Sequence, residues 1–67
     1  MIRVRVNDVE QELPDGTTVR RVIELHRLTP ERVAIELNKR LLRSDRYDTA
    51  LKDNDELEIV TFVGGGS

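Results

Sequence analysis

The chain closes with three glycines and a serine, Gly64-Gly65-Gly66-Ser67, directly after an apolar run. Glycine has no side chain to pack and loses the most backbone freedom on folding, so these residues add nothing to a core. A segment without Cβ atoms can instead enter a narrow channel and present its C-terminal carboxylate to an enzyme. We therefore interpret residues 1–63 as one folded domain and residues 64–67 as a flexible tail whose end is the reactive group. A linker appended for expression has the same composition and is the alternative interpretation.

The other residues offer little chemistry. His26 is the single histidine and the chain has two serines, so no set of nucleophile, base and orienting group can be assembled. The absence of cysteine excludes disulfides and thiolate zinc sites. The run Asp53-Asn54-Asp55 resembles the start of a calcium loop, but Leu57 and Glu58 stand where that pattern needs Asp or Asn and then Gly. We expect no catalytic residue, no metal ion and no stably bound cofactor, and we assign His26 to the boundary of the core.

The bulk composition narrows the class of protein further. Sixty-seven residues form one domain with one small core. The net charge is −2, from 11 basic and 13 acidic residues, and Tyr47 and Phe62 are the only aromatic residues, a composition that argues against nucleic-acid binding. The sequence has no signal peptide and no apolar run approaching the length of a membrane span, so we expect a soluble, cytoplasmic protein that does not bind membranes.

The tail must be presented by the elements that precede it, and the first of these are a hairpin and a helix. Apolar and polar residues alternate over residues 2–6 and return as a second strand over residues 9–13, with Asn7-Asp8 as the turn. Apolar residues then recur with helical spacing over residues 19–26, after Thr17 or Thr18 as the N-cap. Thr29-Pro30 is expected to end this helix, because the residue before proline avoids the helical region.

The second half of the chain predicts three more strands. Residues 33–37 alternate, Asn38-Lys39 is a turn, and residues 40–42 form a short strand. After an irregular segment, residues 56–63 form the last strand, with Leu57 and Ile59 inward and Glu58, Val60 and Phe62 outward. The order predicts an α+β fold of the β-grasp, ubiquitin-like type: a mixed sheet of four to five strands covered by one helix, with the first and last strands side by side at its centre.

Two blocks of the sequence resemble the ThiS family, the sulfur carriers of thiamine thiazole synthesis. Residues 33–38 (VAIELN) resemble its V-E-L-N-G strand and turn, and residues 51–66 resemble its L-K-D-G-D block and terminal Gly-Gly. The likeness covers the whole chain, although the first half is generic for the fold. Lys39 and Asn54 replace glycines of the family pattern, and Ser67 follows the diglycine where the active family form ends on glycine.

This resemblance implies a mechanism carried by the tail. In the family, a ThiF-like adenylating enzyme uses ATP to convert the terminal glycine carboxylate into an acyl adenylate. Sulfur from a cysteine-desulfurase relay then replaces the adenylate, and the resulting thiocarboxylate gives its sulfur to thiazole synthase. The resemblance thus implies that Gly66 carries the sulfur and that Gly64 and Gly65 thread the partner's channel. Val60 and Phe62, apolar yet outward, are the expected docking residues.

The same resemblance implies a carrier protein and not an enzyme, monomeric when free, with ATP used by the partner. A protease that removes Ser67 is a further expected partner. Three other functions remain open from the sequence: a carrier for molybdopterin synthesis, cysteine synthesis or tRNA thiolation, a ubiquitin-like modifier joined to lysines, and a β-grasp interaction module that carries a linker.

Overall fold

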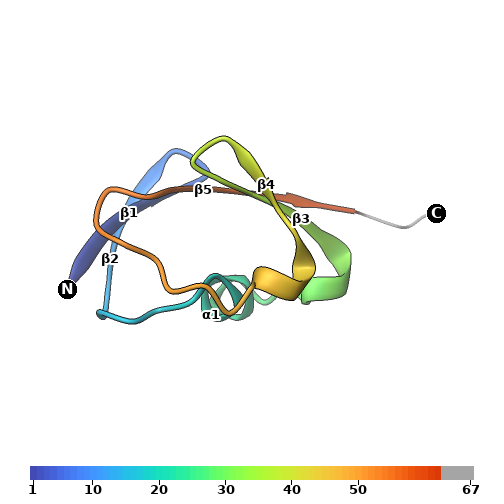
Figure 1. Ribbon diagram of the computed structural model, residues 1–67, viewed down its shortest axis with the longest axis horizontal. Helices are drawn as coiled ribbons and strands as arrows, with labels where there is room; N and C mark the ends of the chain where they lie inside the picture. Colours follow the sequence, from blue (N-terminus) through green and yellow to red (C-terminus); the bar gives the residue numbers. More distant parts are fainter. Residues whose placement is uncertain (63–67) are drawn as a thin grey trace.

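A computed structural model describes residues 1–62 and shows a curved five-stranded sheet with one α-helix across its concave face (Figure 1). The elements in chain order are β1 (Ile2–Val6), β2 (Val9–Leu13), α1 (Val19–Leu25), η1 (Pro30–Arg32), β3 (Val33–Leu37), β4 (Arg40–Leu42), η2 (Ser44–Arg46) and β5 (Glu56–Thr61). The strand order is β2-β1-β5-β3-β4, with β1 and β5 parallel and the other pairs antiparallel. The predicted β-grasp architecture is confirmed, including the adjacent first and last strands.

Two tight turns set the register of the hairpins. Asn7 and Asp8 have φ values of 51° and 69°, and Asn38 and Lys39 have values of 54° and 69°. Positive φ at both central residues twists a two-residue turn in the same sense as its flanking strands. Asn and Asp tolerate this conformation, whereas Lys39 occupies a position where glycine would be unstrained.

The helix begins where the sequence predicts. Thr18 is the N-cap residue, and its hydroxyl oxygen accepts a hydrogen bond of 3.1 Å from the amide of Arg21. Val19, Val22 and Ile23 are buried against the sheet. With seven residues, α1 is too short to cross a bilayer, and no other helix within residues 1–62 is long and apolar enough to do so.

The helix ends earlier than predicted. Arg27 adopts a left-handed conformation (φ 61°), its amide bonds to the Glu24 carbonyl at 2.8 Å, and the Leu28 amide bonds to the Ile23 carbonyl at 3.1 Å. This Schellman pair closes α1 at Leu25, four residues before Thr29. As a consequence His26 lies beyond the buried face and is exposed, with Nδ1 2.9 Å from the carbonyl oxygen of Val22, so its assignment to the core boundary is wrong.

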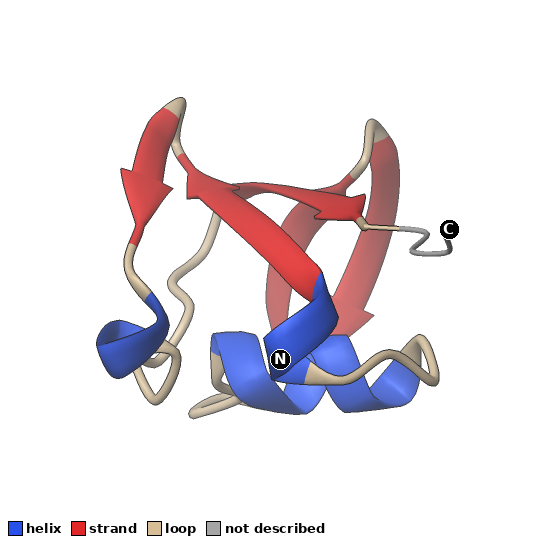
Figure 2. Cartoon of the chain, turned by 90° about the vertical axis from the view of Figure 1, so that its right-hand side faces the viewer, coloured by secondary structure: helices blue, strands red, loops and turns tan. Residues whose placement is uncertain are grey.

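The core fills the space between the sheet and α1, and the 3-10 turns η1 and η2 lie on the same side of the sheet as α1 (Figure 2). Its buried residues are Val4, Val6, Leu13, Val19, Val22, Ile23, Val33, Ile35, Tyr47, Leu51, Leu57 and Ile59. Tyr47 and Leu51 come from the irregular segment between β4 and β5. Burial raises the pKa of the Tyr47 hydroxyl above its ordinary value.

Candidate functional site

The candidate site is the strand that leads to the C-terminus. In β5 the alternation has the predicted sense: Leu57 and Ile59 are buried, whereas Val60 and Phe62 are 58% and 57% exposed. The strand ends at Thr61, two residues before the predicted end. Figure 1 shows β5 running through the sheet and leaving the domain far from the N-terminus. The predicted sulfur-carrying and threading residues, Gly64–Gly66, lie outside the described residues.

Side-chain amides hold β5 from both neighbouring strands. Beyond the end of β1, the Asn7 side chain accepts a 2.8 Å hydrogen bond from the Ile59 amide and donates one of 3.3 Å to the Ile59 carbonyl. These two bonds replace the backbone pair that β1 would have made had it continued beside β5. The sequence pattern predicts Asn7 as a turn residue but does not reveal this second role, because the partner is 52 residues away.

A second amide fixes the start of β5. The Asn38 side chain accepts a 2.9 Å hydrogen bond from the Glu56 amide and donates one of 2.9 Å to the Asp55 carboxylate. The other oxygen of Asp55 accepts a 2.7 Å bond from the Lys52 amide. The turn before β5 is thereby tied to the turn after β3, and the strand cannot slide relative to its neighbours without breaking these bonds.

The exit of β5 is fixed by the backbone. The Phe62 amide donates a 2.8 Å hydrogen bond to the carbonyl oxygen of Arg32, just before β3 begins. Phe62 is therefore anchored through its main chain while its ring stays exposed. This bond fixes the main chain at the last residue that the structure describes.

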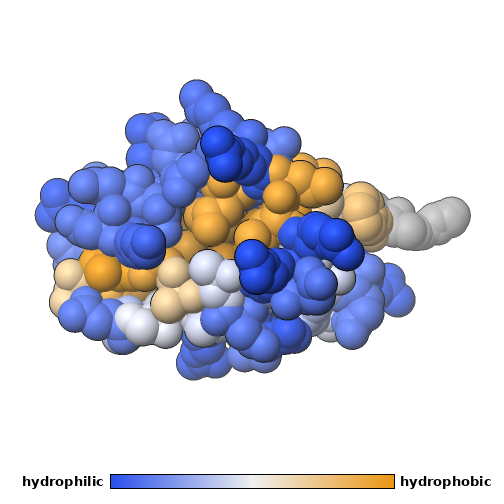
Figure 3. All heavy atoms as spheres, in the orientation of Figure 1, coloured by the Kyte–Doolittle hydropathy of each residue, from blue (hydrophilic) through white to orange (hydrophobic). Residues whose placement is uncertain are grey.

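The outer face of the sheet, opposite α1, carries exposed apolar side chains. Leu41 of β4 is 73% exposed, Val60 of β5 lies on the same face, and Phe62, one residue beyond the end of β5, is exposed as well. Figure 3 shows hydrophobic surface over β4 and toward the end of β5, with hydrophilic surface around the turn between β1 and β2. We call Leu41, Val60 and Phe62 the apolar patch. Grouped apolar exposure of this kind is typical of an interaction surface.

Metal-binding groups and ion pairs were the other candidate features in the part of the chain that the structure describes. Residues 1–62 contain no group of three His, Cys, Asp or Glu side chains placed to hold a metal ion. The ion pairs lie at the surface; the shortest between side chains joins Arg20 Nε to Asp48 at 2.8 Å. The features that mark the site are the end of β5 and the apolar patch beside it.

Comparison with known proteins shows the family and the fold of this chain. The sulfur carrier protein ThiS of Bacillus subtilis (strain 168) is 34% identical over 67 residues, which covers 98% of this chain and 100% of that protein. The thiazole synthase of Magnetococcus marinus is 30% identical over 66 residues, and this chain spans 20% of its length. The crystal structure of the thiamine biosynthesis protein ThiS from Geobacter metallireducens superposes with a TM-score of 0.78 at 28% identity, covering 97% of this chain and 100% of that one. The model of the ThiS family matches residues 2–66, and the chain therefore belongs to the ThiS family.

Proposed function

We propose that this protein is a sulfur carrier of thiamine biosynthesis and that its sulfur is held as a thiocarboxylate on Gly66. The observation that carries the proposal is the clamped strand β5, which Gly64-Gly65-Gly66 follow in the sequence after Phe62 and Val63. The family match supports the same residue, since Gly66 is the last position that it includes. The family match also favours a carrier for thiazole synthesis over a molybdopterin-type carrier and over a protein modifier.

The chemistry requires an activated carboxylate. A carboxylate is a poor electrophile because its charge is delocalised and it has no leaving group. In the proposed first step, a Gly66 carboxylate oxygen attacks the α-phosphorus of ATP and pyrophosphate leaves. In the second step, the outer sulfur of a persulfide attacks the carbonyl carbon and AMP leaves, which gives an acyl disulfide. A thiol of the relay then attacks the inner sulfur of that disulfide, so that the thiocarboxylate leaves and the relay becomes a disulfide; one carboxylate oxygen has been exchanged for sulfur. ATP is bound by the partner, so this chain supplies the arm and the docking face and holds no cofactor of its own.

Three partners follow from this scheme. A ThiF-like enzyme forms the adenylate, a cysteine-desulfurase relay supplies the sulfur, and thiazole synthase accepts it. Support for the last partner comes from the relatives named thiazole synthase, in which the part similar to this chain makes up about a fifth of the protein. Covalent attachment of a donor beside its acceptor raises the effective concentration of the donor. We place the free carrier in the cytoplasm as a monomer.

Ser67 must be removed before the first step. The carbonyl carbon of Gly66 is bonded to the Ser67 nitrogen, so no free Gly66 carboxylate exists in the 67-residue chain. We propose that a protease cleaves this bond. The test compares chains 1–66 and 1–67 in ATP–pyrophosphate exchange with the adenylating enzyme. We expect exchange with chain 1–66 alone, and a 1–66 chain that carries Gly66→Pro serves as the inactive control. Equal exchange with chain 1–67, with Ser67 still present by mass, would contradict the assignment of Gly66.

A further inference from the structure

The outer face of the sheet contains an unfavourable pair of like charges. Glu36 of β3 and Glu58 of β5 are directly opposite in the antiparallel register, so their exposed side chains stand side by side on this face. Side chains that face each other in this way have Cβ atoms about 4.5–5.5 Å apart, and like charges at this separation destabilise a sheet. A folded protein of this size has little stability to spare. A partner that neutralises the pair would explain why it is present.

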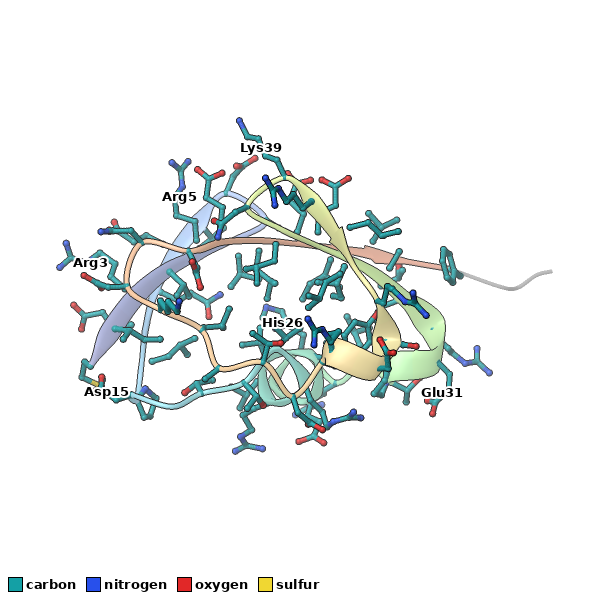
Figure 4. The ribbon with its side chains drawn as sticks, in the orientation of Figure 1. Arg3, Arg5, Asp15, His26, Glu31 and Lys39 are labelled. Carbon is teal, nitrogen blue, oxygen red and sulfur yellow. The ribbon has the colours of Figure 1, made fainter. Side chains whose placement is uncertain are left out.

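Within residues 1–62, neither glutamate forms an ion pair. The two arginines of β1 on this face are engaged elsewhere: Arg3 contacts two glutamates of β2, and Arg5 lies 3.9 Å from Asp8. A hollow of about 310 Å³ lies beside the pair. Its lining includes the three glutamates Glu36, Glu56 and Glu58 together with Arg5, Asp8 and Lys39, and Figure 4 shows Arg5 and Lys39 on the same upper side of the molecule.

Charge is unevenly distributed between the two sides of the molecule. On the outer face, the strands carry five glutamates against two arginines: Glu10, Glu12, Glu36, Glu56, Glu58, Arg3 and Arg5. On the opposite side, the segment 19–32 carries four arginines against two glutamates. An uneven field of this kind orients a protein during association and accelerates encounter with a surface of opposite charge. The outer face will therefore turn toward a basic surface, and two such faces will repel each other.

The acidic pair is continuous with the apolar patch. Glu58 is two residues before Val60 on the same face of β5, and Glu36 is directly opposite Leu41 of β4. The fully extended chain from Phe62 to Gly66 spans at most about 14 Å. A protein docked on the outer face therefore has the Gly66 carboxylate within that distance of the end of the patch.

We propose that the outer face binds a protein surface with an apolar centre bordered by an arginine or lysine whose cation is received between Glu36 and Glu58. This inference rests on the proposed function, because the occupant to which we assign it is the adenylating partner. The cation relieves the repulsion between the two carboxylates and fixes the register of the complex, while the apolar patch supplies the buried area. The repulsion is thus retained in the free carrier and removed by binding.

The test uses Glu36→Gln and Glu58→Gln in the full chain, with Glu31→Gln as the matched control. Glu31 is an exposed residue of η1 that lies on the opposite side of the molecule (Figure 4). We expect each outer-face variant to melt at the same or a higher temperature, because it loses a repulsion. Each should nevertheless associate with the adenylating enzyme roughly three- to tenfold more slowly at low salt, with a weaker dependence on ionic strength. Glu31→Gln should change neither property.

Unchanged association of both outer-face variants would overturn the proposal, as would slower association accompanied by a lower melting temperature, which indicates a folding role. Self-association through this face, seen by sedimentation, would overturn the choice of partner. Failure of the proposed function is separable, because docking of the full chain needs no free carboxylate. If chain 1–66 supports no pyrophosphate exchange while the outer-face variants still bind more slowly, the sulfur chemistry fails and the docking proposal stands.

Discussion

Truncation of Ile59 and of Phe62 should separate stability from binding, because the two residues lie on opposite faces of β5. Ile59 is 8% exposed, and Ile59→Ala removes three buried carbon atoms, worth about 0.8 kcal/mol each in transfer from water. With the cavity left behind, the loss in the free energy of unfolding should be about 2–5 kcal/mol. A domain of this length has about 3–10 kcal/mol in total, so the change is large.

Phe62→Ala should cost much less stability. Full burial of a phenylalanine side chain is worth about 1.5–3 kcal/mol, and this one is 57% exposed, so the loss should be about 0.6–1.3 kcal/mol. The bond from the Phe62 amide to Arg32 involves only the main chain and is retained. In complex with the adenylating enzyme, however, truncation of an aromatic anchor should cost about 2 kcal/mol or more of binding free energy.

The assay is thermal unfolding of both variants together with titration against the adenylating enzyme. The expected result is a fall in melting temperature of at least about 8 °C for Ile59→Ala, at about 4–8 °C for each kcal/mol. Phe62→Ala should remain close to the parent in stability and bind more weakly. Equal destabilisation by the two substitutions would refute the assignment of Ile59 and Phe62 to opposite faces. It would also refute the proposed docking surface, which depends on that assignment.

Three further predictions concern local structure. Asn7→Gly keeps a residue suited to positive φ but removes the amide that bonds Ile59, so hydrogen exchange at the Ile59 amide should accelerate while exchange at Leu57 changes little; equal acceleration at both would indicate global destabilisation instead. Lys39→Gly relieves a left-handed conformation and should raise the free energy of unfolding by up to about 1 kcal/mol in urea titrations, whereas a loss would show that the lysine side chain stabilises the turn. Burial raises the pKa of Tyr47, so the folded state holds this proton more tightly than the unfolded chain; its contribution is complete below about pH 10 and is lost as the pH rises through the folded value. Tyr47→Phe should flatten this alkaline loss in unfolding titrations, and an unchanged pH profile would contradict the assignment.

Features that depend on nearby residues could be predicted from the sequence. The alternation of residues 56–61 identifies which side chains of β5 face the core, because the period of a strand is two. The turn at Asn7-Asp8 was predictable, since few residues adopt positive φ readily. The N-cap at Thr18 was also predictable, because its hydroxyl oxygen accepts a hydrogen bond from Arg21, only three residues along the chain.

Features that depend on distant partners could not be predicted. The bond from Leu28 to Ile23 ends α1 early, and it depends on a left-handed Arg27 that periodicity does not reveal. The two amides that clamp β5 have partners 18 and 52 residues away. The opposition of Glu36 and Glu58 likewise needs the register between β3 and β5, which no local pattern specifies.

The central claim, that Gly66 carries sulfur, is tested most directly by intact-mass measurement. Chain 1–66 is incubated with ATP, the adenylating enzyme and a sulfide donor, and the product is fragmented to locate any change. We expect the mass gain that accompanies replacement of one oxygen by sulfur, located at Gly66 and dependent on ATP. An unchanged mass under conditions in which the same enzyme modifies an established carrier, or a gain located at any other residue, would contradict it.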